Sequence, residues 1–151
     1  MCGGLAFQLS QIPKSELSQY FPENKIQKFE ENGEGLTFYW DENPVLPVVI
    51  DNTAHLVEWG NRSGKDNLPR TGWAKLESIN EGKWRYLNPK SIIIPAIRGY
   101  EKGVWFDING QGLEGISVNK ENIRRIYMVT KPASNDYIKL TKHNRQPIEV
   151  N

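Results

Sequence analysis

The sequence has few of the side chains that carry chemistry. Its 151 residues include one cysteine, two histidines and two methionines. A lone cysteine cannot form an internal disulfide, and it excludes a zinc site built from several thiolates. Metal-ligand, phosphate-loop, dinucleotide and nucleophile-elbow motifs are missing too, so we expect neither a metal nor a cofactor.

Long apolar runs are also missing. No run approaches the length of a membrane span, and the N-terminus lacks the pattern of a signal peptide. We therefore expect a cytoplasmic protein without a membrane partner. Hydrophobic residues make up 38% and charged residues 25% of the chain, which is typical of a folded domain. Without a repeat or linker, residues 1–151 are predicted to form one domain, and we expect a monomer.

Charge is distributed unevenly although the net charge is only +1. Residues 1–61 hold three Lys or Arg against nine Asp or Glu, whereas residues 62–102 hold nine against four. Trp73, Trp84 and Tyr86 lie within this basic segment. Basic and aromatic side chains together favour a phosphate backbone with unstacked bases. A solvated, salt-bridged surface is the alternative, and charge alone favours it.

Most of the chain is typical of short strands. Apolar or β-branched runs bounded by turn residues predict strands at 4–9, 35–40, 44–50, 54–60, 91–97, 104–118 and 123–133. These runs predict an α+β fold with a mainly antiparallel, curved, barrel-like sheet and few short helices.

Three details of this pattern are specific enough to test. Pro44 and Pro47 favour a sheet edge or an irregular extended segment for the run at 44–50. The continuous apolar run at 91–97 is predicted to be the most buried strand. Asn109-Gly110 predicts a turn that joins two strands of the run at 104–118 into a hairpin.

Helices are expected at only two places. Helical spacing after Pro13 predicts a short helix within 13–21, and residues 135–143 favour a helical turn. Residues 61–72 are rich in turn formers and basic side chains, which predicts a surface loop.

The lone cysteine stands at position two, in "MCGG". If Met1 is removed, as is common before a small residue, Cys2 carries a free α-amine beside its thiol. The alternative is that Cys2 is an incidental small residue near a frayed terminus.

Three further side chains are candidates for proton transfer. His55 lies in an apolar strand pattern and is interpreted as structural, whereas His143 lies in a polar segment before a proline, where loop histidines are often functional. Glu101 follows a buried run, where a carboxyl can have a raised pKa and act as an acid or base. An exposed turn glutamate is the other interpretation of this residue.

Several of these stretches, in this order, resemble the SOS-response-associated peptidase (SRAP) family, the abasic-site-shielding and hydroxymethylcytosine-binding protein family. "MCGG" is similar to its Met-Cys-Gly-Arg start, and "WGN" at 59–61 to its Trp-Gly-Leu element. "WAKLE" at 73–77 resembles Asn-Ala-Arg-x-Glu, and "IIIPAIRGYE" at 92–101 resembles Leu-Ile-Pro-Ala-x-Gly-Phe-Tyr-Glu. "HNRQP" at 143–147 resembles His-x-Arg-Met-Pro.

The resemblance implies a function and a set of site residues. It implies an SRAP-like single domain that traps abasic sites in single-stranded DNA covalently, with autoproteolytic or lyase-like activity. Cys2, Glu101 and His143 would be catalytic. The DNA-binding residues would be Lys75, Arg145, Arg70, Trp59 and Trp73, although core packing is an equal alternative for the two tryptophans. Binding to DNA would place the protein at the nucleoid.

The sequence also departs from the family pattern. Trp73 replaces the motif asparagine, Lys75 its arginine, and Gly4 the arginine of the N-terminal motif. The chain also stops soon after His143, which suggests a shortened, divergent member. These departures favour one alternative, a non-catalytic single-stranded nucleic-acid-binding module. A glutamine amidotransferase, whose chains also begin Met-Cys-Gly, is a further alternative, but the Asn-Gly pairs here are typical of turns.

Overall fold

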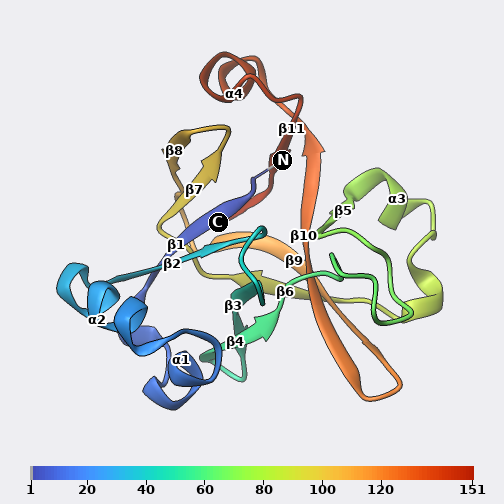
Figure 1. Cartoon of the computed structure of the whole chain (residues 1–151). Coiled ribbons are helices and arrows are strands. Elements are labelled where there is room, and N and C mark those ends of the chain that lie inside the picture. The colour runs from blue at the N-terminus through green and yellow to red at the C-terminus, as the bar shows by residue number, and fades with distance from the viewer. Residues whose placement is uncertain (1) are drawn as a thin grey trace.

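A computed structural model of the chain describes residues 2–151 and has an α+β fold (Figure 1). Its first sheet is antiparallel and has four strands in the order β2, β1, β7, β8. These strands are β1 (Gly4–Gln8), β2 (Glu34–Phe38), β7 (Arg98–Glu101) and β8 (Val104–Asp107). The N-terminal strand is therefore central in this sheet, which fixes the residues next to Cys2.

A second sheet is built around two long strands, β9 (Gly112–Lys120) and β10 (Ile123–Pro132). Four short strands complete it: β5 (Trp73–Lys75), β6 (Lys90–Ile94), β11 (Arg145–Pro147) and β12 (Glu149–Val150). Only the β5–β10 pairing is parallel. The remaining strands, β3 (Val45–Ile50) and β4 (Thr53–Glu58), form an antiparallel pair by themselves.

The helices are short and lie outside the sheets (Figure 1). They are α1 (Lys14–Tyr20), α2 (Glu23–Asn32), α3 (Leu76–Asn80) and α4 (Asn135–Thr141), with 3-10 turns at Leu9–Gln11 and Arg85–Leu87. The α4 helix begins at Ser134, whose hydroxyl accepts a hydrogen bond from the Tyr137 backbone N–H and so satisfies one free donor. The α2 helix ends at Gly33 in a left-handed conformation, φ 72°.

The predicted α+β class and antiparallel pairing are confirmed, and so is the edge position of the run with two prolines. Residues 44–50 pair only with β4, because prolines lack the N–H that a central strand needs. The barrel-like shape is not confirmed, since the strands of residues 2–151 form three separate sheets and no closed barrel. Helices α2 and α3 were not expected from the sequence pattern.

Two predictions about single strands were wrong. The apolar run at 91–97 forms β6, but only Ile94 of this strand is buried, whereas β10 buries six consecutive residues from Arg125 to Thr130. The Asn109-Gly110 turn does not close a hairpin. It joins β8, which pairs with β7, to β9 in the other sheet. Turn chemistry marks a reversal of the chain, but the partner of each strand is chosen by tertiary packing.

The core consists of three apolar clusters, and the first of them contains Cys2. The buried residues of this cluster are Cys2, Leu5, Leu46, Val48, Trp59, Ile94, Ile108, Leu113, Ile126 and Met128. The cluster draws on all three sheets, so the N-terminus lies where the sheets meet. His55 lies outside it, and its Nδ1 is 2.9 Å from a carboxylate oxygen of Glu16, which supports a structural role.

The loop at 61–72 has neither helix nor strand, as predicted, and contacts with buried side chains hold it in place. The side-chain amide of Asn61 donates to the carbonyls of Asp66 at 2.7 Å and Leu68 at 3.0 Å. The buried guanidinium of Arg125 pairs with the carboxylate of Asp66. These contacts hold the loop while Arg70 remains exposed at its end.

Candidate functional site

Cys2 precedes β1 and is fully buried, with 0% of its surface exposed. Its thiol donates a hydrogen bond to the carbonyl oxygen of Gly4 at 3.1 Å. The neighbouring strand β7 passes close by, and a Cβ on Gly99 would be 3.0 Å from the Cys2 sulfur. The absence of a side chain at Gly99 therefore makes room for the Phe106 ring, which a Cβ would approach to 2.4 Å, and for the thiol.

The environment of Cys2 keeps its sulfur protonated. The pKa of the thiol is raised from 9.0 to about 12, mainly by burial and to a smaller extent by the nearby carboxylate of Glu101. Backbone hydrogen bonds at Tyr100 and Gly4 oppose this increase only in part. A thiol with this pKa is neutral at physiological pH, so it is a poor first nucleophile.

Glu101 and His143 lie together although they are far apart in the sequence. Glu101 is the last residue of β7 and is buried, with 7% of its surface exposed. His143 follows α4, and its Nδ1 is 3.9 Å from Oε1 of Glu101. The backbone N–H of Arg145 donates to Nδ1 at 3.0 Å, and Nδ1 is also 3.3 Å from the carbonyl oxygen of Arg145, so the backbone fixes the orientation of the ring. The pair can accept, hold and donate a proton next to Cys2.

Tyr137 is a member of this site that the sequence did not indicate. It lies in α4, with 9% of its surface exposed, and its ring packs edge-on against Phe106 at a centroid distance of 5.3 Å. Burial raises the pKa of its phenol, and the neighbouring Cys2 and Glu101 raise it further. The phenol is therefore a neutral hydroxyl beside the thiol and the carboxyl. The only sequence signal was its place in the helical turn before His143.

Trp73 holds the N-terminal segment directly. Its indole Nε1 donates to the carbonyl oxygen of Cys2 at 2.9 Å, and its ring packs against Tyr39 at 4.6 Å. Trp59 is 1% exposed and donates to the carbonyl oxygen of Gly72 at 2.8 Å. Two roles were predicted for these tryptophans, stacking on DNA bases or packing in the core. Trp59 lies in the core, and Trp73 is partly buried beside it.

Arg145 is held within the protein by a carboxylate. Its guanidinium donates to both oxygens of Glu77, at 2.7 and 3.0 Å, and to the carbonyl oxygen of Thr130 at 2.9 Å. The guanidinium lowers the pKa of Glu77 from 4.5 to about 2. This bidentate pair ties α3 to β11 and fixes the chain two residues after His143. Arg145 thus positions the site in this structure, and Glu77 is a site residue that the sequence prediction did not name.

The remaining basic candidates, Lys75 and Arg70, are both exposed and can reach a phosphate. The structure leaves no room for a side chain at Gly4. A Cβ at this position would lie 2.4 Å from the ring of Phe38, which covers the strand here. Any side chain at Gly4 would displace that ring.

No family model matches this chain, and no curated protein matches it. Within residues 2–151, no cluster of three or more His, Cys, Asp or Glu side chains is arranged to hold a metal ion. None of the helices in that part of the chain is long and apolar enough to cross a bilayer.

Proposed function

We propose that this protein is a divergent, barrel-like SRAP-type domain that traps abasic sites in single-stranded DNA as a covalent adduct of Cys2. The observation that carries the proposal is the convergence of Cys2, Glu101 and His143, which come from three distant parts of the chain. The resemblance in sequence assigned chemistry to these same three residues. That chemistry requires these three residues to lie close together.

The proposed reaction begins at the α-amine that Cys2 gains when Met1 is removed, a step that concerns a residue outside the described range. The amine adds to the aldehyde of the ring-opened sugar, and the carbinolamine loses water to give an imine. The thiol then adds to the imine carbon, and its proton passes to the nitrogen. The product is a five-membered thiazolidine, and one water is released. Because amine and thiol belong to one residue, ring closure is intramolecular and strongly favoured.

The raised pKa of the Cys2 thiol supports this order of steps. An α-amine with an ordinary pKa of about 8 is partly neutral at physiological pH, whereas this thiol is protonated. The amine therefore attacks first, and the thiol supplies both the sulfur and the proton of the second step. Glu101 protonates the hydroxyl of the carbinolamine, which then leaves as water, and His143 exchanges protons with the open sugar.

DNA is held by exposed basic side chains around the site. Lys75 and Arg70 contact phosphates, which fix the position of the strand without reading its sequence. The residue before Cys2 is removed first, either by autoproteolysis or by a host aminopeptidase. The protein acts as a monomer in the cytoplasm, at the nucleoid when bound to DNA.

The test is a denaturing gel of processed protein mixed with abasic single-stranded DNA, after mass spectrometry has established that Met1 is absent. We expect a heat-stable adduct with the wild type and none with Cys2→Ala. Cys2→Ser should leave at most a labile imine, since a hydroxyl is a far weaker nucleophile than a thiol.

The chain that retains Met1 is the matched control, because its Cys2 has a buried thiol and no free amine. It should behave as Cys2→Ala does. An undiminished stable adduct from Cys2→Ala would contradict the mechanism. Binding of the strand without any adduct would favour the non-catalytic nucleic-acid-binding module.

A further inference from the structure

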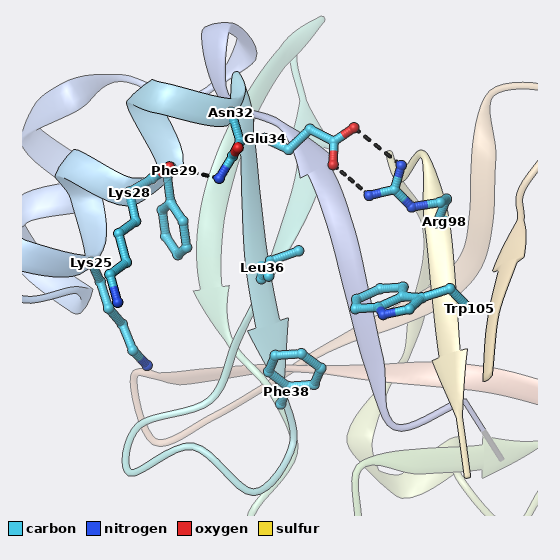
Figure 2. Close-up of a pocket in the computed structure, with 9 residues that line it drawn as sticks. All are labelled: Lys25, Lys28, Phe29, Asn32, Glu34, Leu36, Phe38, Arg98 and Trp105. Carbon is cyan, nitrogen blue, oxygen red and sulfur yellow. Dashed lines mark hydrogen bonds and ion pairs between the residues drawn. The ribbon is translucent and has the colours of Figure 1, made fainter. Parts of the chain in front are cut away.

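A groove of about 630 Å³ is lined by residues of α2, β2, β7 and β8 (Figure 2). The register of the β2-β1-β7-β8 sheet places the strand residues of this groove on the face opposite the buried residues Thr37, Gly99 and Glu101. Its floor is formed by Leu36 and Phe38 of β2. Lys25 and Lys28 of α2 line one side, and Trp105 of β8 lies across from them. None of the residues that line the groove belongs to the Cys2 site.

The groove continues into a group of four aromatic rings. Phe38 stacks on Trp40 with centroids 4.7 Å apart and planes 22° apart, and Tyr100 meets Trp105 edge-on at 5.0 Å. Phe38 also contacts the Tyr100 and Trp105 rings at 5.6 and 6.0 Å. Despite these contacts, Trp40 is 58% exposed and Trp105 is 38% exposed. Two large indole rings in one exposed patch are typical of a binding surface.

The patch arises from the alternation of side chains along the strands. Thr37 of β2 and Gly99 of β7 face the core, whereas Phe38 and Tyr100 are on the opposite face. The first glycines of the chain bring this patch next to the N-terminus, because Gly4 pairs with both Phe38 and Tyr100.

Positive charge accompanies the aromatic rings. The Arg98 guanidinium donates to both carboxylate oxygens of Glu34, at 3.2 and 2.5 Å, so these two charges cancel. Lys25 and Lys28 remain, on one face of α2 three residues apart. They are two of only three basic residues in the acidic stretch 1–61. The groove is therefore positively charged, although most of its lining comes from an acidic stretch of the sequence.

We propose that this groove binds single-stranded nucleic acid on the sheet face opposite the Cys2 site, with bases stacked on Trp105 and Trp40 and phosphates held by Lys25 and Lys28. Stacked rings offer a π-face to any base, and lysines offer point charges to the backbone. A duplex hides the faces of its bases, so the ligand is a single strand. The inference rests on the proposed function for the identity of the ligand, and it adds a second contact region to the path of the strand.

The test uses an intact oligothymidylate, which has no aldehyde, and the chain that retains Met1. No covalent step can then contribute, and fluorescence anisotropy of a labelled strand measures binding alone. We expect Trp105→Ala and Trp40→Ala each to weaken binding about tenfold, the usual effect of removing one base-stacking ring. Trp105→Phe is the matched control and should retain most of the affinity. A duplex of the same length should bind less tightly.

A second pair of variants tests the charges. Lys25→Glu with Lys28→Glu should weaken binding and reduce the slope of log affinity against log salt by about 1.4, since each phosphate contact on a single strand contributes about 0.7. Arg124→Glu, an exposed residue of the β9–β10 hairpin that contacts Asn119 of the same hairpin, should leave both quantities unchanged.

The outcomes separate this inference from the proposed function. The proposal for the groove is contradicted if Trp105→Ala or the double lysine variant binds with wild-type affinity. It is also contradicted if the wild type does not bind an intact strand. Loss of affinity in Tyr86→Ala alone would place the stacking in the basic segment and overturn it too. Self-association through Trp105 without strand binding, seen by sedimentation, would make the groove a self-interface. If the groove variants weaken binding but processed protein forms no adduct, the groove stands and the proposed function fails.

Discussion

The two faces of the β2-β1-β7-β8 sheet have opposite character although the same strands supply both. On the inner face, Glu101 and the thiol of Cys2 are buried. On the outer face, Trp40 and Trp105 are exposed beside two lysines. Strand β7 shows the division residue by residue: Gly99 and Glu101 are buried, while Arg98 and Tyr100 are partly exposed. Alternation along one strand thus separates a proposed reaction site from a proposed recognition surface.

Burial is the physical quantity that distinguishes the two faces. Loss of water raises the pKa of the Cys2 thiol and of the Tyr137 phenol on the inner side. On the outer side, charges meet solvent and pair at the surface, as Arg98 does with Glu34. Substitutions of catalytic residues on the inner face should therefore change the rate of adduct formation by orders of magnitude. Substitutions on the outer face should change the affinity for a single strand by about tenfold.

The largest effect is expected for Glu101→Gln. The amide keeps the shape of the side chain but cannot give up a proton, so adduct formation with abasic DNA should slow by about 10²- to 10⁴-fold, the usual contribution of a general acid or base. Quenched time points on a denaturing gel measure the rate. Glu121→Gln, in the exposed turn between β9 and β10, is the matched control and should react as the wild type does.

His143→Ala should change both formation and reversal of the adduct, because the same proton is moved in each direction. Wild-type rates in either Glu101→Gln or His143→Ala would make that residue structural, and the inner face would lose its catalytic character.

An intermediate effect is expected for the reactivity of the Cys2 thiol in the chain that retains Met1. A pKa raised from 9.0 to about 12 lowers the thiolate fraction at pH 8 by about a thousandfold, so an aromatic disulfide reagent should react about that much more slowly with folded than with urea-unfolded protein. Cys2 is the only thiol, so a single absorbance trace reports it.

The same pKa has a consequence for stability. A raised folded-state pKa adds stability below about pH 9, and this contribution is lost as the pH rises from 9 toward 12. Cys2→Ala should flatten that part of the curve of unfolding free energy against pH. If the reagent labels Cys2 of the native protein rapidly, the thiol is accessible to solvent. The two faces of the sheet would then not differ in burial as proposed.

The smallest effect is expected for Trp73→Phe, which keeps an aromatic ring and removes the N–H bound to the Cys2 carbonyl. One hydrogen bond contributes about 0.5–1.5 kcal/mol, so the adduct should form about two- to tenfold more slowly in processed protein. Trp84→Phe is the matched control for packing, because this buried tryptophan packs against Tyr127 and lies outside the cluster that contains Cys2. Equal loss of Tm in both variants, with a slower rate only in Trp73→Phe, would identify Trp73 as a positioning residue.

Local sequence patterns predicted much of the secondary structure because they depend on neighbours only. Strand alternation located β1, β2, β4 and β10 to within about two residues, and the prolines placed β3 at an edge. Helix α2 was not predicted because its apolar face is narrow, with only Ile26 and Phe29 buried. The partners of the two strands that the Asn109-Gly110 turn joins were predicted wrongly, because strand pairing depends on the whole fold.

By itself, the sequence determined which groups are available: a single thiol at position two, few histidines, and a glutamate after an apolar run. It also determined the α+β class, since periodicity and turn residues act over a few neighbours. Only the tertiary structure decided what surrounds these groups. The pKa of Cys2, the pairing of Arg145 with Glu77 and the aromatic groove beside Gly4 all arise from contacts between distant segments. Burial and charge partners depend on distance in space, and one-dimensional spacing carries no information about them.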